Sequence, residues 1–411
     1  MTCDVSESMN EYTLQAAYHA PSATAQSGLV GPRRVLRILF TFIGGSGHFR
    51  PLIPLARAAQ AAGHSVAVAG ASRRQAEIAA AGFTGIATRA SPPRLTGEPV
   101  GDQNSLETPD PRREQLWLAE GFARRGARRH VTSITEIARQ WRPDVLVRDE
   151  VDFGTAIVAE LLGIPCATVS VLAAGGFLLK ELVAQPLNEL RSEHGLPADP
   201  QLAMLDAGLV LAPHPPSFRD PAFPLPPHAF SFRPQAAVPL RSVSDTPTVY
   251  FTLGTVRTAT DLYNRVLAGL RDLPVNAIVT VGDRFDPADL EPQPDHIRIE
   301  RFIPQEQLLP QCDLVVSHGG SGSVLGALAH GLPAILAPMS ADQPYNARRC
   351  VELGTARVLD PISATSDDVS EAVSDVLANQ AYRHAAERIQ AEYNTLPGSQ
   401  EALTLIERLA S

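Results

Sequence analysis

The stretch from Phe302 to Ala356 reads FIPQEQLLPQCDLVVSHGGSGSVLGALAHGLPAILAPMSADQPYNARRCVELGTA and decides the fold. Within it, DLVVS at 313–317 is a short apolar run, typical of a buried strand. The turn HGGSGS follows, and the helix that begins there ends at Gly331, with Pro333 just beyond. The free N–H groups and the positive dipole end at the start of such a helix favour a bound phosphate group. The pattern therefore predicts a strand–turn–helix unit suited to binding an anion.

Strand and helix patterns alternate on both sides of this stretch. Residues 35–43 form an apolar strand pattern, the loop GGSGHFRP leads into a helix that ends at Gly63, and HSVAVAG reads as a second strand. Residues 178–211 are predicted to be mainly helical, and a proline-dense stretch at 213–247 precedes the strand pattern TVYFTLGT. We expect an α/β protein with two Rossmann-like parallel-sheet domains facing a cleft, with ligands at the carboxyl ends of the strands.

Composition excludes several classes of protein. A chain of 411 residues exceeds what one core usually supports, and its net charge of −9 argues against nucleic-acid binding. The four cysteines lack the spacing of a zinc site or a disulfide scaffold. No apolar run is long enough to span a bilayer, and residues 1–33 lack the pattern of a secretory signal. We expect a cytoplasmic protein with a flexible leader at 1–33 and no stable membrane insertion.

The segment at 302–356 resembles the nucleotide-sugar signature of the inverting GT-B glycosyltransferases, a family that contains plant UDP-glycosyltransferases and bacterial natural-product enzymes. RILFTFIGGSGHFRPLIPLARAAQAAGHSVAVAG is similar to the acceptor-side opening of that family, and VLVRDEVDFGTAIVAELLGIPCATVSV to its Asp-containing unit. The likeness covers about nine tenths of the chain. It implies an acceptor-binding domain at 34–225, a linker at 226–246, a nucleotide-sugar-binding domain at 247–394 and a last helix, 395–411, that packs back on the first domain.

The resemblance also implies the donor site. Phe302 takes the place of a base-stacking aromatic residue, although an ordinary core aromatic would fit the same pattern. Asp342 and Gln343 suit sugar hydroxyls, although Asp342 could instead cap a turn. Thr255 is expected at the diphosphate, although a loop threonine is often a helix cap. The residues expected to bind the nucleotide or its diphosphate are Thr255, Phe302, Ile303, Gln305, His318, Gly319, Gly320, Ser321, Gly322 and Ser323.

One departure from the family pattern concerns the nucleotide. Plant members carry a glutamate three positions after the motif serine, where it binds both ribose hydroxyls, and this chain has Gly326 there. The absence of that carboxylate fits a thymidine diphosphate (dTDP) sugar, whose ribose lacks the 2′-hydroxyl. We expect dTDP, with a UDP-sugar as the alternative donor.

The resemblance of the first domain to the acceptor side of the family implies how the acceptor hydroxyl is activated. A hydroxyl is a poor nucleophile unless a base removes its proton during attack. His48 lies on the loop where the family places that base, although a structural hydrogen bond is the alternative role. Asp149 matches the aspartate that orients the base, and Glu150 could serve instead if the register shifts by one. No DxD motif is present, so we expect no metal and no cofactor besides the donor.

Other classes of function fit this sequence less well. A nicotinamide enzyme needs GxGxxG, but Arg50 stands where the third glycine belongs, and no GK[ST] phosphate loop occurs. A nucleotide-sugar epimerase and a non-catalytic auxiliary protein share the fold and remain alternatives. The expected acceptor is a small hydrophobic aglycone bound by segments 92–129 and 175–211. The sequence leaves the identity of sugar and aglycone, the glycosidic atom, any auxiliary protein and the oligomeric state open, with a homodimer among the alternatives.

Overall fold

Two parallel sheets organise the protein, as seen in a computed structural model that describes residues 34–88, 110–236, 239, 245–254, 259–282, 286–290 and 292–411. The first sheet has the strand order β3-β2-β1-β4-β5-β6-β7, and every pairing in it is parallel. Its strands are β1 (Arg37–Thr41), β2 (Ser65–Ala71), β3 (Thr84–Thr88), β4 (Val145–Asp149), β5 (Cys166–Val169), β6 (Leu209–Ala212) and β7 (Phe230–Ser231).

The second sheet repeats this design with the order β10-β9-β8-β11-β12-β13, again all parallel. Its strands are β8 (Thr248–Thr252), β9 (Asn276–Thr280), β10 (Ile297–Glu300), β11 (Leu314–Ser317), β12 (Ala334–Leu336) and β13 (Ala356–Val358). The strands are rich in apolar, β-branched residues because both faces of a parallel sheet are covered.

Helices connect the parallel strands, as such crossovers require. Those of the first half are α1 (Ser46–Phe49), α2 (Ile53–Ala61), α3 (Gln75–Ala80), α4 (Pro111–Leu118), α5 (Ala127–Trp141), α6 (Phe153–Leu162), α7 (Lys180–Glu193) and α8 (Ala203–Asp206), with a π-helical segment, η3 (Ala119–Gly126), between α4 and α5. Those of the second half are α9 (Thr260–Leu270), α10 (Gln305–Leu308), α11 (Ser321–Ala329), α12 (Gln343–Glu352), α13 (Ser366–Ala378), α14 (Gln380–Thr395) and α15 (Ser399–Leu409). Short 3-10 turns complete the connections at 50–52, 72–74, 216–218, 287–290 and 309–311.

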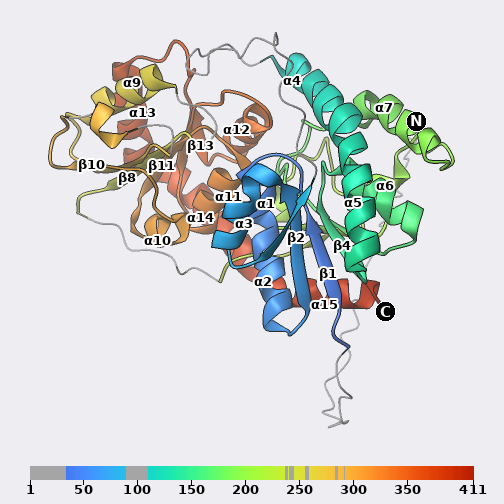
Figure 1. The fold of residues 1–411 in the computed structure, drawn as a ribbon. Helices are drawn as coiled ribbons and strands as arrows, with labels where there is room; N and C mark the ends of the chain where they lie inside the picture. Colours follow the sequence, from blue (N-terminus) through green and yellow to red (C-terminus); the bar gives the residue numbers. More distant parts are fainter. Residues whose placement is uncertain are drawn as a thin grey trace, which may run out of the picture. The chain divides into compact units, whose positions relative to one another are not determined.

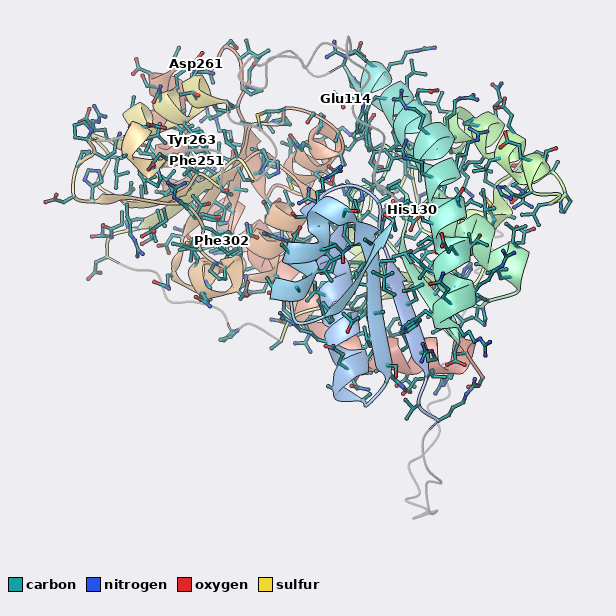
Figure 2. The ribbon with its side chains drawn as sticks, viewed as in Figure 1. Glu114, His130, Phe251, Asp261, Tyr263 and Phe302 are labelled. Carbon is teal, nitrogen blue, oxygen red and sulfur yellow. The ribbon has the colours of Figure 1, made fainter. Side chains whose placement is uncertain are left out.

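Each sheet is buried between helix layers. Helix α15 lies beside α2 on one face of the first sheet (Figure 1), where Leu403 and Ile406 join a core cluster with Ile38 and Phe40 of β1. The opposite face packs against α5 and α6. In the second half, Phe251 and Tyr263 pack with their ring centroids 5.0 Å apart inside the core cluster that surrounds β8 and α9 (Figure 2). The last helix therefore belongs to the core of the first sheet, although it follows the second in sequence.

The strand order predicts where ligands bind. In the first sheet the order reverses between β1 and β4, and in the second between β8 and β11. Loops leaving adjacent strands diverge at such a switch point and leave room for a ligand at the carboxyl ends. His48 and His318 follow β1 and β11, and Asp149 is the last residue of β4. The predicted α/β class with two Rossmann-like parallel sheets is confirmed.

Several elements differ from the sequence expectations. Residues 178–211 were expected to be mainly helical, but β6 begins at Leu209. Its apolar run LVLA is too short for periodicity to distinguish strand from helix. The predicted linker at 226–246 includes β7, which pairs with β6, so its first part adds a strand to the first sheet. Short strands β3 and β13 were also missed because neither carries a clear apolar run.

Some expectations lie outside the described residues. These are the leader at 1–33, Thr255, most of the linker after residue 236, and residues 92–109 of the expected acceptor segment. Within the described ranges, no helix is both long and apolar enough to cross a membrane.

Candidate active site

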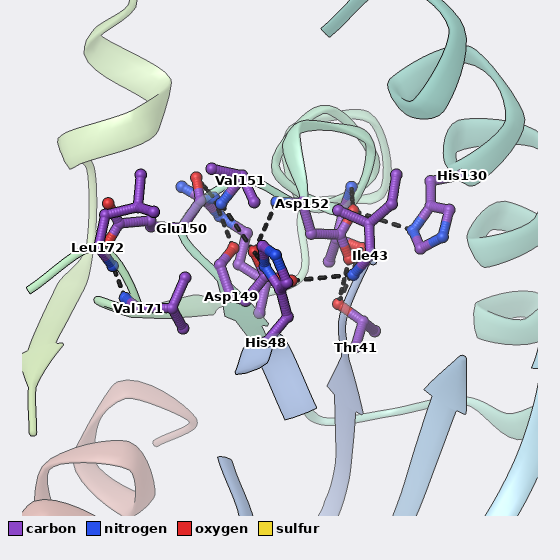
Figure 3. A network of polar contacts seen from close by, with 12 residues as sticks. Thr41, Ile43, His48, His130, Asp149, Glu150, Val151, Asp152, Val171 and Leu172 are labelled. Carbon is purple, nitrogen blue, oxygen red and sulfur yellow. Dashed lines mark hydrogen bonds and ion pairs between the residues drawn. The ribbon is translucent and has the colours of Figure 1, made fainter. Parts of the chain in front are cut away.

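His48 and Asp149 meet at the switch point of the first sheet. His48 lies in the last turn of α1, just after β1, and Asp149 is the last residue of β4. His48 Nδ1 lies 3.6 Å from Asp149 Oδ1, slightly beyond hydrogen-bond range (Figure 3). The His48 side chain is 22% exposed while that of Asp149 is fully buried. One ring nitrogen therefore faces a buried carboxylate, and the imidazole is still reachable by a substrate.

Backbone donors hold the Asp149 carboxylate in place. Its Oδ2 accepts from the Ile43 amide at 2.9 Å, and its Oδ1 accepts from the amides of Val151 and Asp152 at 2.8 and 3.1 Å. Gly44 lies directly against the His48 ring. Its φ is +111°, and a Cβ there would lie 2.8 Å from His48 Cδ2. Only glycine tolerates both the positive φ and the short distance to the ring. Gly44 therefore leaves room for the His48 side chain.

Burial and nearby carboxylates act in opposite directions on the pKa of His48. Burial by itself lowers the pKa of His48. Asp149, Asp342 and Glu150 together outweigh that effect, with Asp149 contributing most, so the pKa of His48 is raised above its usual value. A raised pKa makes the neutral imidazole a stronger proton acceptor near neutral pH.

Glu150 does not contact the His48 ring in the way that the sequence left open for it; it binds backbone amides instead. Its Oε2 accepts hydrogen bonds from the amides of Val171 and Leu172 at 2.7 and 3.3 Å (Figure 3). It therefore orders the loop after β5, and Asp149 is the carboxylate in contact with His48. Geometry favours Asp149 as the orienting group.

A second buried His–Asp pair lies next to the first and was missed by sequence reasoning. His130 Nδ1 lies 3.0 Å from Asp152 Oδ1, and Asp152 Oδ2 accepts from the hydroxyls of Thr41 and Thr155, both at 2.7 Å (Figure 3). Burial opposes ionisation, but His130 and the hydroxyls lower the pKa of Asp152 to about 2. This network ties α5, β1 and α6 together behind Asp149. No spacing in the sequence signals it, because His130 and Asp152 come from different elements.

His318 occupies the switch point of the second sheet, between two glycines. A Cβ at Gly254 would lie 2.8 Å from its Cε1, and one at Gly320 would lie 2.5 Å from its Nε2. Burial is the main influence and lowers the pKa of His318, despite the nearby charge of Asp342. Its buried Nδ1 has no hydrogen-bond partner among the described residues. A neutral imidazole carries one N–H group, which can donate to a phosphate oxygen.

The start of α11 is the turn that the sequence predicts to bind an anion. Gly320 is its N-cap, Gly319 has a φ of +81°, and a Cβ at Gly322 would meet nothing within 4 Å. The Ser323 amide bonds to the Gly320 carbonyl at 3.0 Å. The open space at Gly322 allows close approach of a ligand to the backbone.

Ser321 is tied to protein groups. Its hydroxyl donates to Asp342 Oδ2 at 2.6 Å and accepts from the Ala173 amide at 3.1 Å. Asn346, which the sequence reasoning did not single out, donates to the same Asp342 oxygen at 2.8 Å and to the Gly319 carbonyl at 3.0 Å. Ser321 and Asn346 therefore position the turn and Asp342. The available signal was the asparagine in PADQPYN, one helical turn after Asp342.

Asp342 and Gln343 follow a strained residue. Ala341 has a φ of +55°, which a residue with a Cβ rarely adopts. Gln343 Oε1 closes the turn by accepting from the amides of Met339 and Ser340 at 2.8 and 3.1 Å. Asp342 does not cap α12 with its side chain; the hydrogen bonds it receives from Ser321 and Asn346 all fall on Oδ2. Its Oδ1 and the Gln343 amide nitrogen remain as groups for a ligand.

Phe302 lies at the surface, so it is not a core aromatic (Figure 2). Its side chain is 55% exposed, and the Arg50 guanidinium, from the loop that follows His48, lies 5.7 Å from its ring centre. Ile303, the next residue, is partly buried against the core beneath α10. A Cβ at Gly326 would lie 3.5 Å from Gln305 Oε1, so Gln305 and Gly326 line the same spot.

Hydrogen bonds join the two halves of the chain at the candidate site. Val35–Ser411 form one compact unit, and Ala173 and Ala174, in the loop after β5, donate to Ser321 Oγ and Asn346 Oδ1 at 3.1 and 3.2 Å. The charge of Asp342 acts on both His48 and His318. The structure therefore brings together residues from the loops of both sheets at one place.

Comparisons with known proteins show the class of enzyme. Residues 264–409 match the family model described as Erythromycin biosynthesis protein CIII-like, C-terminal domain. The chain is 28% identical to 4'-demethylrebeccamycin synthase of Lentzea aerocolonigenes, over 91% of this chain and 99% of the relative. The chain is a glycosyltransferase of the GT-B fold. Among solved structures, the transferase resembles CalG4, the calicheamicin glycosyltransferase, with a TM-score of 0.75 at 22% identity, covering 92% of this chain and 98% of that one. It also resembles glycosyltransferase VinC in complex with dTDP, with a TM-score of 0.66 at 25% identity, covering 91% and 99%.

No metal cluster is evident in the part of the transferase that the structure describes: no group of three or more His, Cys, Asp or Glu side chains there could hold an ion. Metal independence stays a prediction. Of the expected site residues, all except Thr255 lie in described segments.

Proposed function

We propose that this glycosyltransferase moves a sugar from a dTDP carrier to a hydroxyl of a small-molecule aglycone, with inversion at the anomeric carbon and without a metal. The observation that carries the proposal is the position of Asp342. Its carboxylate accepts a hydrogen bond from Ser321 at the start of α11, and Ser321 accepts one from Ala173 of the first half. Its charge also raises the pKa of His48 in the first half and opposes the lowering of the pKa of His318 in the second. A sugar bound by Asp342 would therefore lie between a general base and the anion-binding turn.

The base is His48. Its Nε2 takes the proton of the acceptor hydroxyl while that oxygen attacks the anomeric carbon, and its Nδ1 faces Asp149, which stabilises the imidazolium that forms. The bond from the anomeric carbon to the diphosphate oxygen breaks, and its electron pair leaves with the diphosphate. Because attack and departure take place on opposite faces, the configuration inverts.

The leaving group is stabilised by the second half. Charge develops on the diphosphate as the bond breaks, and the free amides at the start of α11 together with the neutral His318 supply donors there. Asp342 Oδ1 and the Gln343 amide would bind sugar hydroxyls. Phe302, exposed beside Arg50, would stack on the pyrimidine.

The nucleotide preference rests on Gly326. A side chain there would meet Leu309 Cδ1 at 3.2 Å and Gln305 Oε1 at 3.5 Å, so this part of the site offers an amide and no carboxylate for ribose hydroxyls. A deoxyribose lacks the 2′-hydroxyl and therefore needs fewer hydrogen-bond partners at such a site. The likeness to VinC, whose structure contains dTDP, supports the same choice.

Calorimetric titration with dTDP, UDP and NAD tests the proposal. We expect dTDP to bind more tightly than UDP and NAD not to bind, with dTDP affinity reduced about tenfold or more in His318→Ala, because a charge-assisted donor is lost. The matched variant His48→Ala should keep dTDP affinity and lose transfer to any acceptor that the unmodified protein accepts. Tighter UDP binding would refute the dTDP preference, NAD binding alone would refute the function, and unchanged turnover in His48→Ala would remove His48 as the base.

A further inference from the structure

Three aromatic rings form a continuous row that starts at His48. The imidazole stacks on Phe122 with 5.7 Å between ring centroids and 29° between planes. Trp117 meets the other part of Phe122 edge to face, at 5.5 Å and 71°. The row runs away from the proposed base along α4 and η3, within the half of the chain expected to bind the acceptor.

The row depends on the π-helical turn. In an α-helix, residues five apart point about 140° away from one another, so Trp117 and Phe122 would not touch. A π-helix bonds each amide to the carbonyl five residues earlier, as the Ala127 amide does with the Phe122 carbonyl. The wider turn brings residues five apart onto one face. A π-helical turn is rare and is often found at functional sites.

Close packing fixes this turn beside the catalytic residues. A Cβ at Gly126 would lie 2.6 Å from Ile43 Cδ1 and 2.9 Å from the Gly121 carbonyl oxygen. The π-helical turn therefore packs closely against the Ile43 side chain. The Ile43 amide in turn donates to Asp149. The position of the aromatic row is therefore set by the same loop that positions the base.

Helix α4 is also fixed to the donor half. Gln115 Nε2 donates to the Gly176 carbonyl at 3.0 Å and to the Tyr345 hydroxyl of α12 at 2.8 Å. Tyr345 lies three residues after Asp342, the proposed sugar-binding residue. A molecule bound on α4 would therefore lie next to both the base and the donor.

The exposure of Trp117 has no structural explanation in this fold. Its side chain is 55% exposed, although an indole gains most when it is buried. Leu116, the neighbouring residue, is 49% exposed and has no aromatic ring. An isolated exposed apolar residue is ordinary, whereas an exposed indole in contact with a ring that stacks on a base is typical of a ligand surface.

We propose that Trp117 and Phe122 form the acceptor-binding surface and that the preferred acceptor is a planar aromatic ring system bearing a hydroxyl. This proposal rests on the proposed function, because it takes His48 as the base. A flat aromatic molecule can lie against the indole and the Phe122 edge at ring distances of about 4.5–7 Å, with its hydroxyl directed to His48. A puckered saturated ring cannot match two such surfaces.

Calorimetry with two probes, on the full chain saturated with dTDP, tests this inference. The probes are 1,8-dihydroxyanthraquinone, a planar phenol, and cyclododecanol, a saturated ring alcohol. We expect the anthraquinone to bind and cyclododecanol to bind at least tenfold more weakly. Trp117→Ala and Trp117→Leu should each weaken anthraquinone binding about tenfold, because both remove the aromatic face. Leu116→Ala, the matched control on the same helix, should leave it unchanged.

Binding of dTDP separates the possible failures. It should be the same in all these variants, which shows that each is folded. Anthraquinone affinity that is unchanged in both Trp117 variants would overturn the inference, as would cyclododecanol binding as tightly as the anthraquinone. If the unmodified protein binds no dTDP, the proposed function fails, and the anthraquinone comparison, repeated without nucleotide, still decides the role of Trp117.

Discussion

At the scale of single residues, the proposed chemistry depends on His48 and on the Asp149 carboxylate that faces it. The imidazole must be neutral to accept a proton, and Asp149 is the group that most strongly raises the pKa of His48 against the effect of burial. Activity should therefore be complete above that raised pKa and be lost as the pH falls through it. Glu150 raises the same pKa from a greater distance, while it binds the amides of Val171 and Leu172.

Replacing Asp149 should move the acid limb of the pH profile. In Asp149→Asn the pKa of His48 falls, so the decline of kcat/KM at low pH should begin at a lower pH. The plateau should fall about a hundredfold, since the imidazolium loses its stabilising charge. Glu150→Gln is the matched control and should shift the limb less. A limb that stays in place in Asp149→Asn would show that His48 is not the group that titrates; thermal melting checks the fold of both variants.

At the scale of elements, glycines decide how closely the segments around the site approach one another. Gly44 and Gly254 adopt positive φ beside a histidine ring, while Gly126 allows η3 to pack on Ile43. A methyl group at Gly44 or Gly254 would contact a histidine ring, and one at Gly126 would contact Ile43. Such a change would displace these side chains of the candidate site rather than the strands of the sheet.

Gly126→Ala is the sharpest test at this scale. Its Cβ would lie 2.6 Å from Ile43 Cδ1 and 2.9 Å from a backbone oxygen, and relief requires the π-helical turn to shift. We expect a loss of about 1–3 kcal/mol in the free energy of unfolding, measured by urea denaturation. Gly47→Ala, in α1, where a Cβ would meet nothing within 4 Å, should have no such cost. Equal stability of the two variants would contradict the close packing of η3 on Ile43.

At the scale of the whole molecule, a small set of hydrogen bonds joins the halves at the donor site. Asn346 is fully buried and accepts from the Ala174 amide of the first half, while it donates to Gly319, Ser321 and Asp342 of the second. One side chain thus connects the loop after β5 to the anion-binding turn and the sugar-binding carboxylate.

Asn346→Ala should weaken both stability and donor binding. Four polar groups lose a partner, which should cost about 3 kcal/mol of unfolding free energy, and dTDP affinity should fall because the turn and Asp342 are no longer held. Asn188→Ala is the control: Asn188 bonds to the Ala184 and Asp199 carbonyls and to the Asp199 amide, all within the first half. It should lower the melting temperature without changing dTDP affinity. A similar loss of dTDP affinity in both variants would show that Asn346 acts only through general stability.

The amino-acid sequence by itself determined the two α/β halves, the anion-binding turn at 318–323 and the candidate base and aspartate. Those features are local: an apolar run of strand length, a glycine-rich turn and a helix beginning can each be read from adjacent residues. The short strands β3, β6 and β13 escaped because runs of three to five residues carry too little periodicity.

Only the tertiary structure decided which side chains meet. The His130–Asp152 pair, the bond from Ala174 to Asn346 and the stacking of Phe122 on His48 join residues 22 to 172 positions apart, and no pattern along the chain encodes such distances. The contact between Trp117 and Phe122 is close in sequence but depends on a π-helical turn, which is stabilised by packing on Ile43. Hydrophobic patterning sets the elements, whereas close packing and the pairing of buried polar groups set the site.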